Sequence, residues 1–114
     1  MRIERFEDII SWQKSKEMAV IIYKLFNNNK DFGFKDQIQR AVISVSNNIA
    51  EGFERKSNNE FKHFLYIAKG SCGEVRSILY IAAELKYVSK DDFEKIYNLS
   101  LEISRLLSGL IKTF

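Results

Sequence analysis

Apolar residues recur along most of the chain at intervals of three and four, the spacing at which side chains share one face of an α-helix. This pattern predicts four helices separated by three short breaks, at about residues 8–26, 35–54, 58–86 and 90–112. Because the breaks are short, consecutive helices should run antiparallel, so we expect an all-α, up-down-up-down four-helix bundle. Neither an internal repeat nor a shift in composition divides the sequence, which predicts a single domain over residues 1–114.

Polar residues mark the breaks between these helices. The segment NNNKDFG, residues 27–33, should end the first helix, because asparagine side chains bond to nearby backbone and Gly33 relaxes the turn. Ser57 and Glu60 have the spacing of a capping box, in which the serine accepts an amide hydrogen bond at the start of a helix. Ser89 is placed to cap the fourth helix in the same way.

The composition is that of an ordinary globular protein, with 46% apolar and 29% charged residues. The absence of proline favours long helices.

No apolar run approaches the length of a membrane span, and the N-terminal MRIERFEDII has no signal-peptide core, so we expect a cytoplasmic protein without a membrane partner. The single cysteine, Cys72, suits a reducing compartment. The net charge of +3 permits a nucleic-acid partner without requiring one.

A band of polar side chains borders the apolar stripe of the helix expected at 35–54. This polar band consists of Gln37, Arg40, Ser44, Asn48, Glu51 and Arg55. The fully exposed side of the helix should lie further round, near Gln39, Ser46 and Ala50. We therefore expect the polar band to be half-buried at a boundary between helices or between subunits, where its members must be paired.

Glu51 precedes Arg55 by four residues, a favourable order for an ion pair within a helix. We also expect Glu51, and Glu74 from the following helix, to pair with Arg40 or Arg55. Gly52 inside the helix predicts the close approach of another backbone, because glycine costs about 1 kcal/mol relative to alanine there. Two interpretations of the polar band stay open: a structural network, or a surface for recognition or oligomerisation.

Three segments resemble the small four-helix-bundle proteins encoded in bacterial 23S rRNA intervening sequences: FEDIISWQKS, DQIQRAVISVSNNIAEGFER and SNNEFKHFLYIAKGSCGEVRS. The resemblance covers about residues 6–111, and NIAEGFER is its most specific part. Val42 and Ser46 depart from the residue types that are usual in the family. The resemblance implies a homo-oligomer, commonly a pentameric ring, with no accepted catalytic activity. Similar proteins are accessory partners of reverse transcriptases in bacterial retroelements, which points toward nucleic acid.

The helix expected at 58–86 is apolar over a wider arc than a simple bundle helix needs. Gly70 and Gly73 lie near its middle and suggest close packing on more than one side. We interpret the additional apolar surface as a contact between subunits.

Cations and aromatic residues alternate on the far side of the same helix. Lys62, Lys69 and Arg76 are spaced by seven residues and so share one line, which we call the basic row. Tyr66 and Tyr80 lie in a parallel line beside it. Such a surface suits nucleic acid, because phosphates take the charge and bases stack on rings. The alternative is a solvated face whose tyrosines pack at a helix boundary.

The residues that carry chemistry in enzymes are scarce. His63 and Cys72 are single representatives of their types, so no thiolate–imidazole metal site can form within one chain. GSCG, residues 70–73, falls inside a helical pattern and lacks the Gly-Lys-Ser/Thr ending of a phosphate loop. A di-iron bundle needs two Glu-x-x-His pairs, and Glu60–His63 is the only one. We therefore expect no enzyme activity, cofactor or metal.

These observations predict an oligomeric bundle that binds structured RNA or an RNA-containing complex. The side chains expected to contact nucleic acid are Arg40, Arg55, Lys56, Lys62, Tyr66, Lys69, Arg76 and Tyr80. The alternative is a ring that acts as a structural scaffold and binds a protein partner, for example a reverse-transcriptase-type enzyme, without direct RNA recognition.

Overall fold

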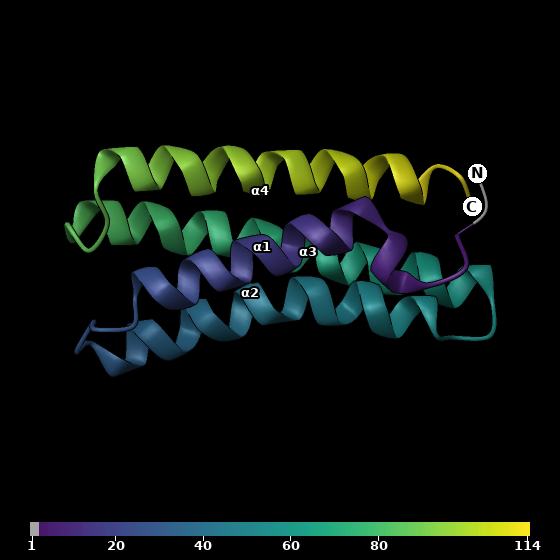
Figure 1. The fold of residues 1–114 in the computed structure, drawn as a ribbon, viewed down its shortest axis with the longest axis horizontal. Coiled ribbons are helices and arrows are strands. Elements are labelled where there is room, and N and C mark those ends of the chain that lie inside the picture. The colour runs from purple at the N-terminus through teal and green to yellow at the C-terminus, as the bar shows by residue number, and fades with distance from the viewer. Residues whose placement is uncertain (1–2) are drawn as a thin grey trace.

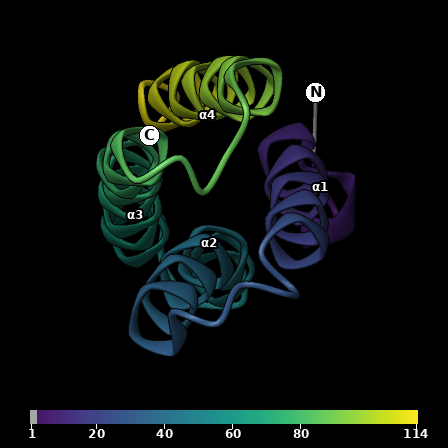
Figure 2. The same cartoon turned by 90° about the vertical axis from the view of Figure 1, so that its left-hand side faces the viewer.

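The computed structural model describes residues 3–114, which form four long helices and one short one. The elements are the 3₁₀-helix η1 (Phe6–Asp8) and the α-helices α1 (Ile10–Leu25), α2 (Phe32–Phe53), α3 (Asn58–Glu84) and α4 (Lys90–Ile111). Figure 1 shows the α-helices side by side along a body of 42 × 22 × 19 Å, each reversing the direction of the one before. Viewed along the bundle, α1 to α4 occupy its four corners in chain order (Figure 2). The predicted all-α fold with four helices is confirmed.

Side chains from all four helices meet in one apolar core. The largest fully buried ones are Phe26, Met18, Ile22, Ile38, Ile49, Leu65, Leu79, Ile96, Ile103 and Leu107. Burying each such side chain stabilises the fold by roughly 1.5–3 kcal/mol. Within residues 3–114, no helix combines the length and the apolar character that crossing a membrane requires.

The first two helices begin at different residues from those predicted. Asp8 belongs to η1, because Ile9 adopts an extended conformation and separates η1 from α1. The Asp31 carboxylate accepts a hydrogen bond from the Phe34 amide at 3.2 Å and caps α2. Helix α2 therefore starts at Phe32, and Gly33 lies in its first turn. The prediction that Gly33 belongs to the preceding turn is wrong.

The predicted caps of the last two helices are confirmed. The Ser57 hydroxyl accepts a hydrogen bond from the Glu60 amide at 3.1 Å and donates to the Glu60 carboxylate at 3.3 Å. The Ser89 hydroxyl accepts from the Asp92 amide at 3.1 Å.

Helix α3 ends at Glu84, two residues earlier than predicted. Lys86 has a φ of 60°, in the left-handed region that usually favours glycine. The amides of Lys86 and Tyr87 donate to the carbonyls of Ala83 and Ala82, at 3.0 and 2.8 Å. This Schellman arrangement satisfies carbonyls at the end of the helix and turns the chain toward α4.

Gly52 permits the close approach of α2 and α3. A Cβ atom at this position would lie 2.5 Å from Phe64 Cβ, 3.1 Å from Phe61 Cδ1 and 3.4 Å from the Phe61 carbonyl oxygen. The close approach predicted at Gly52 is confirmed, and side-chain atoms of α3 are nearer than its backbone. Gly109 in α4 differs, because nothing lies within 4 Å of the corresponding position.

Replacing Gly52 by alanine should therefore destabilise the bundle. We expect Gly52→Ala to lower the free energy of unfolding by about 1–3 kcal/mol, because the added methyl group overlaps Phe64 and forces the helices apart. Gly109→Ala is the matched control, and should be neutral or should raise that free energy by up to about 1 kcal/mol through helix propensity. Urea unfolding followed by circular dichroism measures both. If the two variants unfold alike, the contact at Gly52 is looser than the structure indicates.

Candidate nucleic-acid interface

The basic row lies on the flank of α3 that faces α4. Its spacing of seven residues keeps Lys62, Lys69 and Arg76 within about 40° of one another around the helix. All three are half-buried. Tyr66 and Tyr80, in the line beside them, are 53% and 54% exposed. The structure thus brings together the cations and the aromatic rings that the sequence predicted as neighbours.

Arg76 also links α3 to α4. Its Nη1 donates to the Ser100 carbonyl at 3.5 Å and lies 3.8 Å from the Cys72 sulfur. The Cys72 thiol donates to the same carbonyl at 3.2 Å. A Cβ atom at Gly73 would lie in ordinary van der Waals contact, 3.6 Å from Arg76 Nη2, so the guanidinium group does not require glycine there. Arg76 is therefore held in place by α4, whereas Lys62 and Lys69 form no such bond to another side chain or carbonyl of residues 3–114.

Burial raises the pKa of the Cys72 thiol above its ordinary value. The charge of Arg76 and its hydrogen bond act in the opposite direction but are weaker than the effect of burial. The thiol is therefore protonated at neutral pH, and a buried protonated thiol is a poor nucleophile.

Tyr80 packs in an aromatic cluster with Phe93 and Tyr97 of α4. Its ring centroid lies 5.5 Å from that of Phe93 and 5.7 Å from that of Tyr97, and Phe93 and Tyr97 stack on each other. The Tyr80 hydroxyl donates to the Tyr97 hydroxyl at 3.2 Å, and this hydrogen bond raises the pKa of Tyr80. Tyr80 is thus both packed at a helix boundary and open to solvent on one side.

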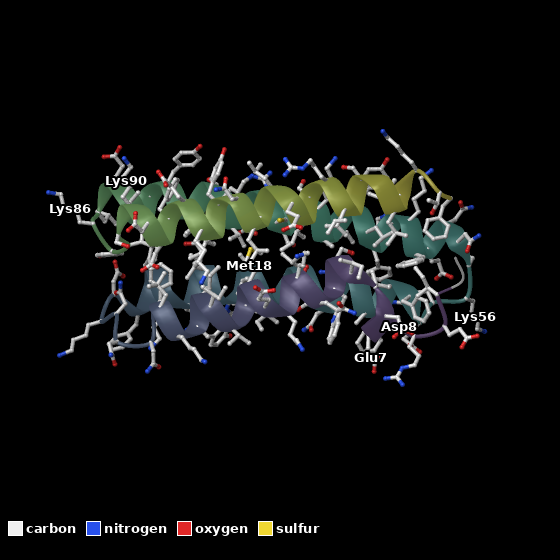
Figure 3. All side chains as sticks on the ribbon, turned by 45° about the horizontal axis from the view of Figure 1, so that its top comes forward. Glu7, Asp8, Met18, Lys56, Lys86 and Lys90 are labelled. Carbon is white, nitrogen blue, oxygen red and sulfur yellow. The ribbon has the colours of Figure 1, made fainter. Side chains whose placement is uncertain are left out.

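The remaining predicted contacts lie apart from the basic row. Arg55 and Lys56 follow α2 at the end of the bundle where α3 begins, and Figure 3 shows Lys56 at that end. Arg55 donates to Glu51 at 3.0 Å, and its guanidinium lies 4.9 Å from the centre of the Phe64 ring. Arg40 lies on the outer side of α2. The eight candidate residues therefore do not form one continuous surface within a single chain.

Two residues of the polar band form a hydrogen-bonded network with α3. The Ser44 and Ser71 hydroxyls lie 2.8 Å apart. The Asn48 side-chain amide donates to the Ser44 carbonyl at 2.7 Å and to its hydroxyl at 2.9 Å. Ser44, Asn48 and Ser71 are half-buried, as predicted for the band. This part of the band holds α2 against α3.

The ends of the polar band are exposed rather than half-buried. Gln37, Arg40, Glu51 and Arg55 face solvent in this chain. Ser46, which was expected on the exposed side, is buried and lines the boundary with α1. The reason is that α1 packs against the side of α2 that carries Ser46. The side that carries the arginines of the polar band therefore faces solvent.

The predicted ion pairs are confirmed only in part. Glu51 and Arg55 form the expected pair. Arg40 pairs with Asp36 at 2.8 Å instead of with Glu51, because both members of that pair lie on the same outer turn of α2. Glu74 is exposed and forms no ion pair with another residue of the described range 3–114.

No group of three or more His, Cys, Asp or Glu side chains in the described part of the chain is placed to hold a metal ion.

The family model described as 23S rRNA-intervening sequence protein matches residues 7–109. The chain belongs to this family. The resemblance inferred from the sequence is thereby confirmed.

A solved relative has the same fold as this 23S rRNA-intervening sequence family member. It is the crystal structure of a protein of unknown function from the S23 ribosomal protein family of Bacteroides thetaiotaomicron VPI-5482. The two chains are 34% identical with a TM-score of 0.84, over 90% of this chain and 99% of the other. No curated protein matches the chain. Family membership and the solved relative thus establish the fold and leave the function to be argued from the surface.

The two parts of the polar band should differ in their contribution to stability in this family member. Ser44→Ala should lower the free energy of unfolding by about 1 kcal/mol, because Ser71 and Asn48 lose a half-buried partner. Glu51→Ala should cost about 0.5 kcal/mol or less, since an exposed pair of this kind stabilises a helix weakly. Urea unfolding of both variants tests this difference. A larger loss for Glu51→Ala would show that Glu51 has a buried partner.

Proposed function

We propose that this protein is a non-enzymatic homo-oligomer that binds structured RNA through the α3–α4 flank. The observation that carries the proposal is the basic row, Lys62, Lys69 and Arg76, beside the exposed rings of Tyr66 and Tyr80. The family description, which refers to the intervening sequences of 23S rRNA, supports an RNA partner. Such a partner would place the protein in the cytoplasm.

The length of the basic row suits a phosphate backbone. A rise of 1.5 Å per residue separates successive cations by about 10 Å along α3 and the outer two by about 21 Å. Lys62 and Lys69 have no carboxylate partner within 4.0 Å in residues 3–114. Their charge is therefore available to phosphates, in contrast to that of Arg40 and Arg55, which are already paired with carboxylates.

The neighbouring aromatic cluster supports base stacking. The Tyr80 ring packs against Phe93 and Tyr97. The Tyr80 side chain therefore loses little conformational freedom when a base stacks on its exposed side. Arg76 is held by the Ser100 carbonyl and presents its charge in a fixed position. Each subunit of an oligomer would present one copy of this flank, and several weak copies facing one RNA gain avidity.

A second function is favoured by a different observation. The outer face of α3 exposes the apolar side chains of Ile67, Ile81 and Leu85, and grouped apolar side chains on a surface are typical of a protein contact. These side chains support a scaffolding ring that contacts protein, for example a reverse-transcriptase-type enzyme, without RNA recognition. Salt dependence separates the two functions, because phosphate contacts release counterions.

Replacing Lys62 and Lys69 by glutamine should weaken RNA binding and flatten its dependence on salt. Each lost phosphate contact should reduce the slope of log affinity against log salt by about 0.7–0.9. Arg76 is left unchanged because it links α3 to α4. Filter binding of a structured RNA, such as an intervening-sequence hairpin, at several salt concentrations measures the change.

Lys24→Gln with Lys30→Gln is the matched control, since it removes the same charge from α1 and from the turn before α2, at lysines that also form no ion pair within residues 3–114. The control should lose much less affinity than the Lys62 and Lys69 double variant. If the wild type does not bind RNA at low salt, or if both double variants lose affinity equally, the α3–α4 flank is not the binding surface. The scaffolding function would then be preferred.

A further inference from the structure

A groove lies between the start of α1 and the end of α4. Figure 1 shows these two segments at the same end of the bundle. The groove has a volume of about 540 Å³, a size typical of sites for small molecules. None of the eight residues expected to contact nucleic acid lines it. Most of its lining is apolar, and the apolar side chains are Ile3, Ile9, Ile10, Leu106 and Leu110.

The Ser11 hydroxyl is a buried polar group without a hydrogen-bond partner in residues 3–114. Ser11 is 3% exposed and is one of the residues that line the groove. Ser15, one turn further along α1, is also buried, but its hydroxyl donates to the Ser11 carbonyl at 2.6 Å. Buried hydroxyls are nearly always paired, because an unpaired one costs free energy. The Ser11 hydroxyl therefore indicates a polar partner that the chain itself does not supply.

Backbone amides at the start of α1 are unpaired as well. Ile9 precedes the helix in an extended conformation, and its side chain cannot accept a hydrogen bond. The first backbone hydrogen bond of the helix runs from the Gln13 amide to the Ile9 carbonyl at 3.1 Å. The amides of Ile10, Ser11 and Trp12 thus have no backbone acceptor in the described range. Free amides and the positive end of the helix dipole favour a negatively charged acceptor at this place.

The charged residues that line the groove act in both directions on such an acceptor. Arg105 of α4 is exposed and forms no ion pair within residues 3–114. Glu102 is paired with Lys14 at 3.3 Å. Asp8, just before α1 (Figure 3), has no ion-pair partner in the described range and would repel an anion. Arg105 and Asp8 should therefore have opposite effects on the binding of an anion.

We propose that this groove binds an amphiphilic carboxylate, meaning an apolar chain with a single carboxylate head, as in a medium-chain fatty acid. The chain would lie against Ile9, Leu106 and Leu110. The carboxylate would accept hydrogen bonds from the Ser11 hydroxyl and from free amides at the start of α1, with Arg105 nearby. This site is separate from the proposed RNA flank and does not depend on RNA binding.

Gly109 of α4 leaves room for the apolar chain. It lines the groove, and nothing lies within 4 Å of a Cβ atom built there. A larger side chain at this position would take up space in the groove without meeting the rest of the chain at its Cβ atom. Gly109→Leu should therefore prevent binding, whereas Gly109→Ala, the matched control, should retain most of it.

Decanoate is the probe for this site, and isothermal titration calorimetry measures its affinity. Decyltrimethylammonium has the same apolar chain with a cationic head, and it should bind at least about tenfold more weakly. Ser11→Ala should weaken decanoate binding about tenfold, because a hydrogen bond to a charged group is lost. The same substitution should not lower the melting temperature of the free protein, since the hydroxyl has no partner to lose. Ser15→Ala is the control for affinity, because Ser15 does not line the groove.

The two charged residues of the groove test the sign of the head group. Arg105→Gln should weaken decanoate binding about two- to fivefold, and Asp8→Asn should strengthen it by a similar factor. Lys95→Gln is the matched control, because Lys95 is also exposed on α4, forms no ion pair within residues 3–114 and lies outside the groove. It should bind decanoate like the wild type.

Several results would overturn the proposal. These are a wild type that does not bind decanoate, equal affinity for the two amphiphiles, and unchanged affinity in Ser11→Ala or in Gly109→Leu. The titrations contain no RNA, so their failure would leave the proposed RNA function intact. Conversely, a wild type that binds decanoate but no RNA would remove only the RNA function.

Discussion

The packing of α2 against α3 fixes how both helices are rotated, and most of the surface follows from that rotation. Gly52 lets the two helices approach until Phe64 and Phe61 of α3 occupy the space that a side chain would need. The Ser44–Ser71 hydrogen bond fixes the position of α2 along α3 at a second point, about two turns before Gly52. With these two points fixed, α3 can present only one flank to α4 and only one face to solvent.

Competition for partners decides which cations are available on that surface. Arg40 and Arg55 form ion pairs with carboxylates four residues before them, and Arg55 also lies over the Phe64 ring. Arg76 is bound to the Ser100 carbonyl, which positions its charge without neutralising it. Lys62 and Lys69 have no carboxylate partner in the described residues. The basic row is therefore a better candidate for phosphate binding than the larger set of cations that surrounds it in the sequence.

The proposed RNA flank and the exposed apolar face, which the sequence predicts as a contact between subunits, lie on different sides of α3. The basic row and Tyr80 face α4, whereas Ile67, Ile81 and Leu85 face away from the bundle. A ring built through the apolar face would leave one basic row per subunit exposed. Repetition then compensates for the small number of charges, because linked weak sites bind one polymer with high avidity.

Local patterns in the sequence determined the elements of this fold. The spacing of apolar residues predicted four helices, and Ser57 and Ser89 marked the starts of α3 and α4 because capping depends on a few adjacent residues. Gly52 and the Glu51–Arg55 pair could be predicted for the same reason, since both follow from positions within one helix. The basic row was also visible in the sequence as a spacing of seven.

Tertiary structure decided what each helix face contacts. The sequence could not show that α1 covers Ser46 or that α4 holds Arg76, because each depends on a residue from another helix. The Asp36–Arg40 pair, in contrast, has the same spacing of four residues as Glu51–Arg55, so the sequence contained the signal for it. The start of α2 shifted for a related reason, as Asp31 and several asparagines could each have capped it. Helical periodicity fixes which side chains share a face, and only packing between helices determines whether that face meets protein or solvent.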